Sequence, residues 1–425
     1  MNLIWRAFYR LLLWLAFPLA FLYLLKRSRK QPDYRRHWGE RLGFYPPRPA
    51  GAARPIWLHA VSVGEMRASA PLVKALKARD PARPILLTCM TPTGRATAQE
   101  LFGQDAEIAF LPYDYPGAVR RFLAHFQPRL GLLMETELWP NLIQTCADAG
   151  VPLLLANARL SEKSLNGYLR VKPLIAPAVA RLSGVLAQSP ADADRLRQLG
   201  AQAVEVVGNI KFDNLPPAPL VERGQGWKAA LAGRRLLLFA SSREGEEILL
   251  LEALKRAGWP DDLLLLLVPR HPQRFDEVAA LLAQQGLPAV RRSAWEGDAL
   301  APQVRVLLGD SMGEMTAWFA LAEVVVMGGS ILPFGSQNLI EACAVGAPVL
   351  LGPSVFNFAQ AAELALECGA ARQEPDADGL ARAALQLLVD ADARAAMGQA
   401  GREFAAAHRG ATQRLLDYLV RNVPS

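Results

Sequence analysis

The chain has 425 residues, of which 52% are hydrophobic and 20% are charged, so it is not an intrinsically disordered chain, and its length predicts two domains of roughly 200 residues each. A formal net charge of +7 favours an anionic partner such as a nucleotide or an anionic lipid, while the lack of a basic stripe interleaved with aromatic residues argues against nucleic acid. The cysteines form no C-x-x-C pair, which argues against a zinc site and a disulfide framework and fits a reducing compartment; they are Cys89, Cys146, Cys343 and Cys368.

Residues 1–30 are predicted to form a helix that anchors the chain to a membrane. Residues 11–25 hold no charge, and this run of 15 residues is shorter than the about 20 residues that cross a bilayer squarely. A helix that extends back to Leu3 would be long enough to cross the bilayer, with the side chains of Arg6 and Arg10 snorkelling toward an interface. A helix that spans the bilayer, a helix that lies in its interface and a buried hairpin are all compatible with this pattern.

A basic collar follows this apolar helix directly, and no small-residue cleavage site accompanies it. The sequence therefore predicts an uncleaved anchor, with the globular part on the cytoplasmic side near anionic lipid. The collar consists of Lys26, Arg27, Arg29, Lys30, Arg35 and Arg36.

Residues 31–215 alternate short apolar runs with amphipathic segments, which predicts a doubly wound domain with a parallel sheet covered by helices on both faces. Helical patterns include residues 65–79 and 115–126. Residues 213–226 are rich in proline and polar side chains and are predicted to be an interdomain linker. The expected strands are Ile56–Val61, Ile85–Cys89, Ile108–Leu111, Leu130–Met134, Val151–Ala156, Val185–Gln188 and Val204–Val207.

Residues 216–425 repeat the alternation and predict a second doubly wound domain, with a helical tail over residues 378–420. Ligands of such sheets bind beyond the carboxyl ends of the strands, and the polar motifs described next all follow predicted strands. The expected strands of this domain are Leu236–Ala240, Leu263–Val268, Val304–Leu308, Val324–Met327 and Val349–Leu351.

The first polar motif, residues 57–65, is a strand that turns into a helix. Ser62 is a candidate N-cap, and Gly64 permits the close approach of a ligand. Glu65 falls in the first helical turn, where it either complements the helix dipole or acts as a general base that takes a proton from a sugar hydroxyl. Its position alone does not choose between these roles.

Three further charged groups follow strands of the first domain. Arg95 lies where a predicted strand passes into a helix, in a segment that is rich in hydroxyl side chains. This segment could bind an anionic acceptor, or it could simply be the capped start of a helix. Glu135 and Glu137 share a face if the chain is extended, and we expect one of them in the cleft and the other at a helix cap. Arg159 and Lys211 suit a phosphate or a sugar carboxylate; the alternative for each is a surface or hinge charge.

Residues 334–350 are the most informative stretch of the second domain. A glycine turn opens a short helix near Gln337, Glu341 lies inside that helix, and a Gly-x-Pro then begins an apolar strand. The N–H groups of the helix suit a phosphate, and a carboxylate one turn further in can accept from ribose hydroxyls. An ordinary loop, helix and strand with a solvated Glu341 is the alternative.

Two other motifs of the second domain carry chemistry. Arg270 is permanently charged and suits a phosphate oxygen, whereas the neighbouring His271, in a turn flanked by proline, is expected to be a structural hydrogen-bonding group. Residues 310–315 place a Gly-Glu pair where backbone groups can meet a pyrimidine or a ribose; the alternative is a capped helix start.

The order of these motifs resembles one family. HWGERLGF, HAVSVGE, METELWPN, NARLS, GNIKFD, PRHPQR, GDSMGEM, GGS and GSQNLIEACAVGAPVLLGPSVFNF occur in sequence over residues 36–360, and together with the N-terminal helix they are similar to the 3-deoxy-D-manno-octulosonic acid (Kdo) transferases. The resemblance implies a GT-B fold, in which two Rossmann-like domains face a cleft. It also implies an inverting glycosyltransferase that moves Kdo from CMP-Kdo to the lipid A precursor (lipid IVA) in lipopolysaccharide biosynthesis, at the cytoplasmic side of the bacterial inner membrane.

The resemblance also implies roles for individual residues. The general base of the family falls on Glu65, and the carboxylate and lysine that stabilise the transition state fall on Glu135 and Lys211. Ser62, Gly64, Arg95 and Arg159 are candidates for acceptor binding. The CMP contacts fall on Pro269, Arg270, Met312, Gly313, Glu314, Asn338, Leu339, Ile340 and Glu341.

One departure from the family pattern is visible, because many members carry Gly-Gly-His-Asn-Pro-Leu-Glu where this chain has Gly335 to Glu341, with Gln337 in place of the histidine. No Asp-x-Asp lies where a metal–diphosphate bridge needs one, so we expect no metal and no other cofactor in the donor site. Two alternatives are another membrane-associated GT-B nucleotide-sugar transferase and a catalytically inactive GT-B module that binds lipid.

Overall fold

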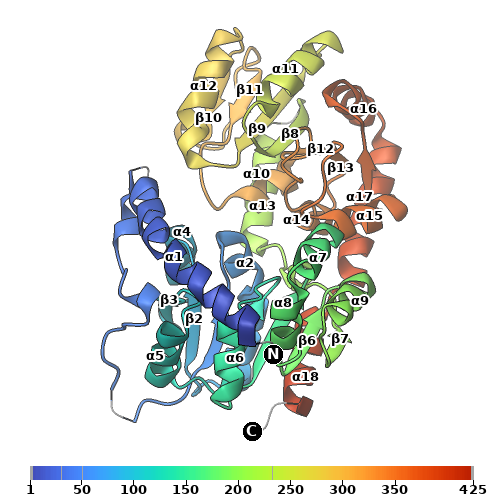
Figure 1. Cartoon of the computed structure of the whole chain (residues 1–425). Helices are drawn as coiled ribbons and strands as arrows, with labels where there is room; N and C mark the ends of the chain where they lie inside the picture. The colour runs from blue at the N-terminus through green and yellow to red at the C-terminus, as the bar shows by residue number, and fades with distance from the viewer. Residues whose placement is uncertain (1–2, 30, 50, 232, 423–425) are drawn as a thin grey trace. The chain divides into compact units, whose positions relative to one another are not determined.

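The computed structural model describes residues 3–29, 31–49, 51–231 and 233–422. The chain folds into two compact units (Figure 1). Unit 1 is Met1–Asn214 together with Arg409–Ser425, and unit 2 is Leu215–His408. Each unit is built on its own parallel sheet.

The sheet of unit 1 has the order β3-β2-β1-β4-β5-β6-β7, and each neighbouring pair is parallel. This is the strand order of a doubly wound dinucleotide-binding fold with one strand added at an edge. All seven strands match predicted runs: β1 (Ile56–His59), β2 (Ile85–Cys89), β3 (Ala106–Phe110), β4 (Leu130–Met134), β5 (Leu153–Ala158), β6 (Gly184–Ala187) and β7 (Val204–Val206).

Side-chain alternation along these strands builds one apolar layer on each face of the sheet. Trp57 enters the layer that also contains Phe122, whereas its neighbour Leu58 enters the layer that contains Met66 and Leu72. The covering elements are α2 (Val63–Ala68), α3 (Ala70–Arg79), α4 (Pro92–Phe102), α5 (Pro116–Phe126), α6 (Pro140–Asp148), α7 (Glu162–Leu169), α8 (Lys172–Val179) and α9 (Pro190–Gln198), with the short 3-10 helices η1 (Pro32–Arg35), η2 (Glu40–Leu42) and η3 (Ile210–Asp213).

The apolar N-terminal segment forms one helix, α1 (Leu3–Ser28), which belongs to unit 1. Within the described residues, Ile4–Ser28 is the one helix long and apolar enough to cross a membrane, with a mean hydropathy of 1.8. The Arg10 guanidinium Nε donates to Asn141 Oδ1 of α6 at 3.4 Å, and snorkelling of Arg6 and Arg10 to a membrane interface stays a prediction.

Unit 2 repeats the architecture with the strand order β10-β11-β9-β8-β12-β13-β14. The strands are β8 (Arg235–Ser242), β9 (Leu263–Pro269), β10 (Ala289–Arg291), β11 (Val306–Leu308), β12 (Val324–Met327), β13 (Val349–Leu351) and β14 (Ala371–Gln373). The sequence did not predict the edge strands β10 and β14. The helices are α10 (Ala218–Ala230), α11 (Glu246–Arg256), α12 (Phe275–Gln284), α13 (Met315–Leu321), α14 (Ile340–Val345), α15 (Ala359–Glu367), α16 (Ala377–Val389) and α17 (Ala391–Ala407), with the 3-10 helices η4 (Pro272–Arg274) and η5 (Arg292–Ala294).

The predicted linker over residues 213–226 is wrong for most of its length, because α10 begins at Ala218. The helix packs closely on α13: a Cβ at Gly224 would lie 2.3 Å from the Ala317 carbonyl oxygen. Trp227 is buried against Trp318, with ring centroids 5.2 Å apart. Burial of this tryptophan overrides the helix-breaking composition of the segment.

The second domain was predicted to run to residue 425, and this boundary needs correction, because α18 (Ala411–Asn422) belongs to unit 1. Asp213 accepts the backbone N–H groups of Gly410 and Thr412, both at 2.6 Å. The apolar face of α18, with Leu415 and Tyr418, joins the unit-1 core. The chain therefore crosses to unit 2 after Asn214 and returns after His408.

Candidate functional site

The predicted site residues fall into two groups, one in each unit. In unit 1, Glu65 lies in the first turn of α2 just beyond β1, and the Ser62 hydroxyl caps that helix by accepting from the Glu65 N–H at 3.4 Å. The Glu65 carboxylate turns back and accepts from the Val61 N–H at 2.8 Å and from the Ser62 hydroxyl at 3.1 Å. This is a variant of the capping box, in which the glutamate accepts from the N–H of the residue before the N-cap; it is called the capping box below. The predicted N-cap role of Ser62 is confirmed.

The capping box fixes the Glu65 side chain, but it does not keep the carboxyl fully ionised. Burial raises the pKa of Glu65 from its ordinary value of 4.5 to about 7, and the negative charges of Glu135 and Glu137 raise it further, against the opposing bonds from Val61 and Ser62. A carboxyl with a pKa near neutrality can both take and release a proton under working conditions. A Cβ on Gly64 would meet only Ser62 Oγ, at 3.9 Å, so the backbone beside Glu65 is open to a ligand.

Glu135 and Lys211 form an ion pair in the same unit. Lys211 Nζ lies 2.7 Å from Glu135 Oε1, and the two side chains are only 17% and 15% exposed. Two asparagines place the lysine: the Asn157 side chain accepts from the Ile210 N–H at 3.1 Å, and the Asn209 side chain accepts from the Lys211 N–H at 3.0 Å. The pair that the resemblance implies is thus held together by the structure.

Backbone strain marks the strand ends beside this pair. Glu135, directly after β4, has φ 58°, and Asn157, at the end of β5, has φ 51°. Left-handed conformations at residues other than glycine cost of order 1–3 kcal/mol and cluster at functional sites. Asn157 is the first residue of the NARLS motif, and the sequence assigned no role to this asparagine; its position near the end of an apolar strand was the available signal.

The predicted division of labour between Glu135 and Glu137 is wrong in one part. Because Glu135 is left-handed, the chain is not extended there, so the extended geometry assumed for these two residues does not hold. Glu137 accepts from the Trp139 indole N–H at 2.6 Å, and Trp139, the N-cap residue of α6, forms no side-chain cap. Neither carboxylate caps the helix.

Arg95 and Arg159 differ in their settings. The Arg95 guanidinium donates to the buried carboxylate of Glu40 at 2.6 Å, so a large part of its charge is balanced within unit 1. Arg159 follows β5, and its backbone N–H lies 3.4 Å from the Glu135 carbonyl oxygen, which places it next to the ion pair. Their acceptor roles stay predictions.

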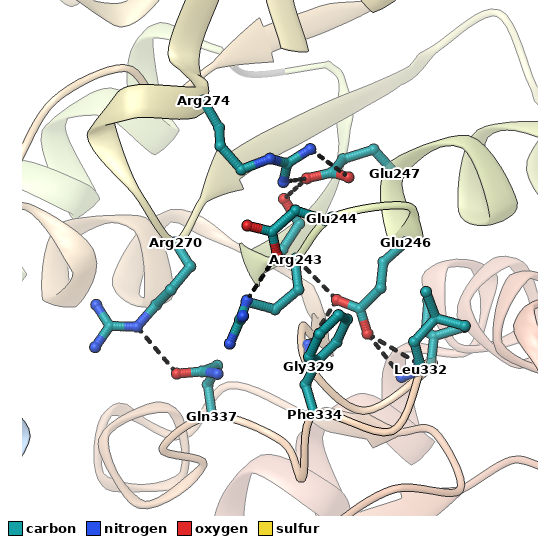
Figure 2. A network of polar contacts seen from close by, with 12 residues as sticks. Arg243, Glu244, Glu246, Glu247, Arg270, Arg274, Gly329, Leu332, Phe334 and Gln337 are labelled. Carbon is teal, nitrogen blue, oxygen red and sulfur yellow. Dashed lines mark hydrogen bonds and ion pairs between the residues drawn. The ribbon is translucent and has the colours of Figure 1, made fainter. Parts of the chain in front are cut away.

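In unit 2, Arg270 and Gln337 meet beyond the carboxyl ends of β9 and β12. Arg270 Nε donates to Gln337 Oε1 at 3.1 Å (Figure 2). The amide oxygen of Gln337 thus orients the guanidinium. The neighbouring His271 has its pKa lowered by burial and by the nearby charges of Arg243 and Arg270, so it is uncharged at neutral pH.

The short helix α14 begins at Ile340, later than the predicted start near Gln337. Asn338 accounts for the difference, because its side-chain oxygen accepts from the Ile340 N–H at 3.1 Å while its amide group donates to Glu341 at 3.0 Å. Glu341 therefore stands in the first turn of the helix and not one turn further in. Leu339 and Ile340 are buried, and the Ile340 N–H is bonded to Asn338, so the CMP contacts at these two residues stay predictions.

The Met312–Glu314 motif forms the turn before α13. Met312 is 59% exposed, and a Cβ on Gly313, where φ is 79°, would meet nothing within 4 Å. The Glu314 carboxylate accepts from Arg292 at 3.0 Å and from Arg223 at 3.1 Å. Pro269 is the last residue of β9 and is buried.

Sequence reasoning did not single out the residue that organises this loop cluster, Glu246. Its fully buried carboxylate accepts backbone N–H groups from Arg243 at 2.9 Å, Gly329 at 2.7 Å, Ile331 at 3.0 Å and Leu332 at 3.2 Å. Figure 2 shows these bonds converging on one side chain. Glu246 thereby ties the loop after β8 to the loop after β12, which leads into the Gln337 segment. The available signal was a glutamate in the first helical turn after a strand, as at Glu65.

A cation–π contact and a buried ion pair lie beside Glu246. The Arg243 guanidinium lies 4.3 Å from the Phe334 ring centroid, and Glu247 pairs with Arg274 at 2.5 Å. Among the residues that the structure describes, no group of three or more His, Cys, Asp or Glu side chains is arranged to hold a metal ion.

Two doubly wound parallel sheets, each with polar side chains beyond the carboxyl ends of its strands, are the architecture of the GT-B fold. A putative UDP-N-acetylglucosamine 2-epimerase from Listeria monocytogenes shares the fold with a TM-score of 0.60 at 16% identity, over 88% of this chain and 98% of that one.

Sequence comparison identifies the family. The model described as 3-Deoxy-D-manno-octulosonic-acid transferase (kdotransferase) matches residues 36–214. The 3-deoxy-D-manno-octulosonic acid transferase of Bordetella pertussis is 46% identical over 95% of this chain and 96% of its own length. The enzyme of the same name from Haemophilus influenzae is 36% identical over 99% of this chain and 100% of its own length. The chain belongs to the Kdo transferase family and is a glycosyltransferase.

Proposed function

We propose that this enzyme transfers Kdo from CMP-Kdo to a hydroxyl of the lipid A precursor (lipid IVA), with inversion at the anomeric carbon, as a step of lipopolysaccharide biosynthesis. The observation that carries the proposal is the Glu65 carboxyl, which a capping box holds in place and whose pKa is raised to about 7. The identity of the transferred sugar is inferred from membership of the Kdo transferase family.

In the proposed step, the acceptor oxygen bonds to the anomeric carbon of Kdo as the bond from that carbon to the CMP phosphate oxygen breaks. The hydroxyl proton passes to Glu65, and CMP leaves with the bonding electrons. A general base of this kind contributes roughly 10²–10⁴ in rate. The Glu135–Lys211 pair offers a fixed ammonium group to the charge that develops in the transition state.

Residues of unit 2 are proposed to hold the donor. Arg270, oriented by Gln337, binds the CMP phosphate. Asn338 and Glu341, which are hydrogen-bonded to each other, offer an amide and a carboxylate to the ribose hydroxyls. The backbone of the turn at Met312 to Glu314 is proposed to meet the cytosine. Neutralisation of the phosphate by Arg270 is the reason we propose a reaction without a metal or other cofactor.

The proposed location is the cytoplasmic side of the bacterial inner membrane. The apolar helix α1 and the exposed cations that follow it, among them Lys26, Arg27 and Arg29, support attachment to an anionic bilayer. The proposed partners are therefore CMP-Kdo, the lipid A precursor and the inner-membrane lipids.

The test uses the purified full chain with CMP-Kdo and the tetraacylated lipid A precursor, and reads the mass of the lipid product. We expect the Kdo mass to be added and CMP, not UDP, to be released. Release of UDP from a UDP-sugar would favour another nucleotide-sugar transferase. A protein that binds the lipid but shows no thermal shift with CMP would be a catalytically inactive module.

A further inference from the structure

The helix α1 has two faces of different character, and the one that packs on unit 1 runs along the whole helix. The packed side chains recur every three or four residues, as one face of a helix does. They include Trp5, Tyr9, Leu13, Phe17, Phe21 and Leu24. Trp5 and Tyr9 contact the apolar layer of unit 1, and Leu24, at the other end, is only 2% exposed.

Polar bonds fix this packed face at several levels of the helix. The Tyr9 hydroxyl donates to Asp114 Oδ2 at 2.9 Å, and the Tyr115 hydroxyl donates to the Leu13 carbonyl oxygen at 2.6 Å. Near the end of the helix, Arg35 Nε donates to the Ser28 hydroxyl at 3.0 Å. Asp114 is itself held by the N–H groups that begin α6, so the helix is bonded to the interior of unit 1 and not to a loose surface loop.

The opposite face of α1 is apolar and exposed. Its large side chains include Phe8, Leu11, Leu15, Leu19 and Leu22, which are between 51% and 65% exposed. No charged residue stands on this face before Lys26. Just beyond it, Lys26, Arg27, Arg29, Arg35 and Arg36 are all exposed. An apolar stripe that ends in exposed cations is complementary to an anionic lipid surface.

The geometry excludes a transmembrane position for the docked helix. From Trp5 to Leu24 the helix rises about 29 Å, which is about the thickness of a hydrocarbon core. A crossing helix would carry the flank of unit 1 into that core along its full length, including the Asp114 carboxylate and the polar loops around it. Exposed loops and unpaired charges do not occur in hydrocarbon.

We infer that α1 lies in the plane of the membrane, on one leaflet, with its Phe8–Leu22 stripe immersed in an anionic bilayer surface and its other face bonded to unit 1. This inference rests on the membrane attachment in the proposed function and adds its geometry. In this arrangement unit 1 is held at a fixed distance from the lipid surface, so an acceptor lipid need not leave the bilayer fully to reach the domain.

The test measures immersion depth along the stripe. Spin labels are placed on the full chain as Phe8→Cys, Leu11→Cys, Leu15→Cys and Leu22→Cys, each with Cys368→Ser. The other cysteines, Cys89, Cys146 and Cys343, are buried, and the Cys368→Ser protein alone is the labelling control. Depth is read from the accessibility of each label to oxygen and to a water-soluble paramagnetic reagent, in vesicles of phosphatidylethanolamine and phosphatidylglycerol.

An in-plane helix predicts four similar and shallow depths, about 5–10 Å below the headgroups. A spanning helix predicts that the label at Leu15 is the deepest and that those at Phe8 and Leu22 are each about 10 Å shallower. That profile would overturn the inference, and so would labels that stay in water in the presence of vesicles. Label–label broadening without lipid would show that a second copy of the chain covers the stripe, and would also overturn it.

Two further measurements are the dependence of vesicle binding on lipid composition and salt, and the Kdo transfer activity. Replacing phosphatidylglycerol by phosphatidylcholine, or raising the salt, is expected to weaken vesicle binding at least tenfold, because several cations adjoin the stripe. Kdo transfer is assayed on the same samples. A spanning depth profile with full activity would refute the in-plane inference alone, whereas an in-plane profile without transfer would refute the proposed function alone.

Discussion

Replacing Glu65 with glutamine separates the proposed base from its structural role. The amide oxygen of Glu65→Gln can still accept from the Val61 N–H, and its NH2 group can donate to the Ser62 hydroxyl oxygen in place of the bond that Glu65 accepts there. The side chain therefore keeps its place, but the amide cannot take a proton. We expect binding of CMP-Kdo to stay within about threefold of wild type, and turnover to fall by roughly 10²–10⁴. In the wild type, kcat/KM should rise about tenfold per pH unit up to an apparent pKa near 7.

The same substitution has a predicted effect on stability that depends on pH. The folded-state pKa of Glu65 is about 7 against an ordinary 4.5, so the folded protein binds the proton more tightly. The wild type therefore loses stability as pH rises from 4.5 to 7, by at most about 3 kcal/mol. The neutral glutamine escapes this loss, and Glu65→Gln should gain relative to wild type between pH 5 and pH 8.

Urea unfolding at pH 5 and pH 8 measures this gain, and Glu100→Gln is the control. The Glu100 side chain is 68% exposed, and its neutralisation should change the free energy of unfolding by less than about 0.5 kcal/mol at either pH. A stability difference between Glu65→Gln and wild type that is the same at both pH values would refute the raised pKa. Turnover of Glu65→Gln within tenfold of wild type would refute the base assignment.

The remaining predictions concern the residues that hold the two sites. Lys211→Met leaves the Glu135 carboxylate without its partner and should cost about 2–3 kcal/mol in urea unfolding, most of which the additional change Glu135→Gln should restore. Gln337→His should leave CMP affinity within about threefold at pH 8 but lower it further at pH 6, where a protonated imidazole repels Arg270; calorimetric titration at the two pH values checks this. Glu246→Gln leaves one side-chain oxygen where two oxygens accept four backbone N–H groups, so two of these bonds are lost. We expect a cost of about 2–4 kcal/mol in unfolding and a weaker thermal shift with CMP.

The sequence predicted most strands because they lie in apolar runs of the chain. All seven strands of unit 1 and the five inner strands of unit 2 could be located in this way, and the polar motifs fell at the strand ends, where parallel sheets bind ligands. The edge strands β10 and β14 each contain an arginine and have mostly exposed or half-buried side chains, so no apolar run marks them. The inner strands β11 and β13 are equally short, but both consist of a valine and two leucines that are buried. Helix α10 was hidden because proline and glycine dominate local preference there, while the burial of Trp227, which depends on distant residues, decides the outcome.

Site geometry was predictable only where a local motif sets it. The capping box of Ser62 and Glu65 is contained within four consecutive positions and could be anticipated. The left-handed backbone at Glu135 could not, because nothing in its neighbours requires it, and the result was a wrong assignment for Glu137. The return of α18 to unit 1 depends on bonds from Asp213, which lies about 200 positions earlier in the chain, and no local pattern carries that information.

Each unit has a glutamate in the first helical turn after a central strand, but the surroundings of the two side chains differ. This difference is the reason why Glu65 is assigned as a catalytic base and Glu246 as a structural residue. Glu65 and Glu246 each stand in the first helical turn after a central strand and accept from the backbone just before it. Glu246 is fully buried and accepts four backbone N–H groups, which occupy both of its oxygens. Glu65 accepts from one N–H and one hydroxyl, remains partly exposed beside an open Gly64, and has two acidic neighbours. Burial raises the pKa of Glu246 as well, against the four N–H bonds that lower it, so the difference lies in access. Both oxygens of Glu246 are buried and occupied, whereas Glu65 is partly exposed and crowded by negative charge, so it can take a proton from a hydroxyl acceptor.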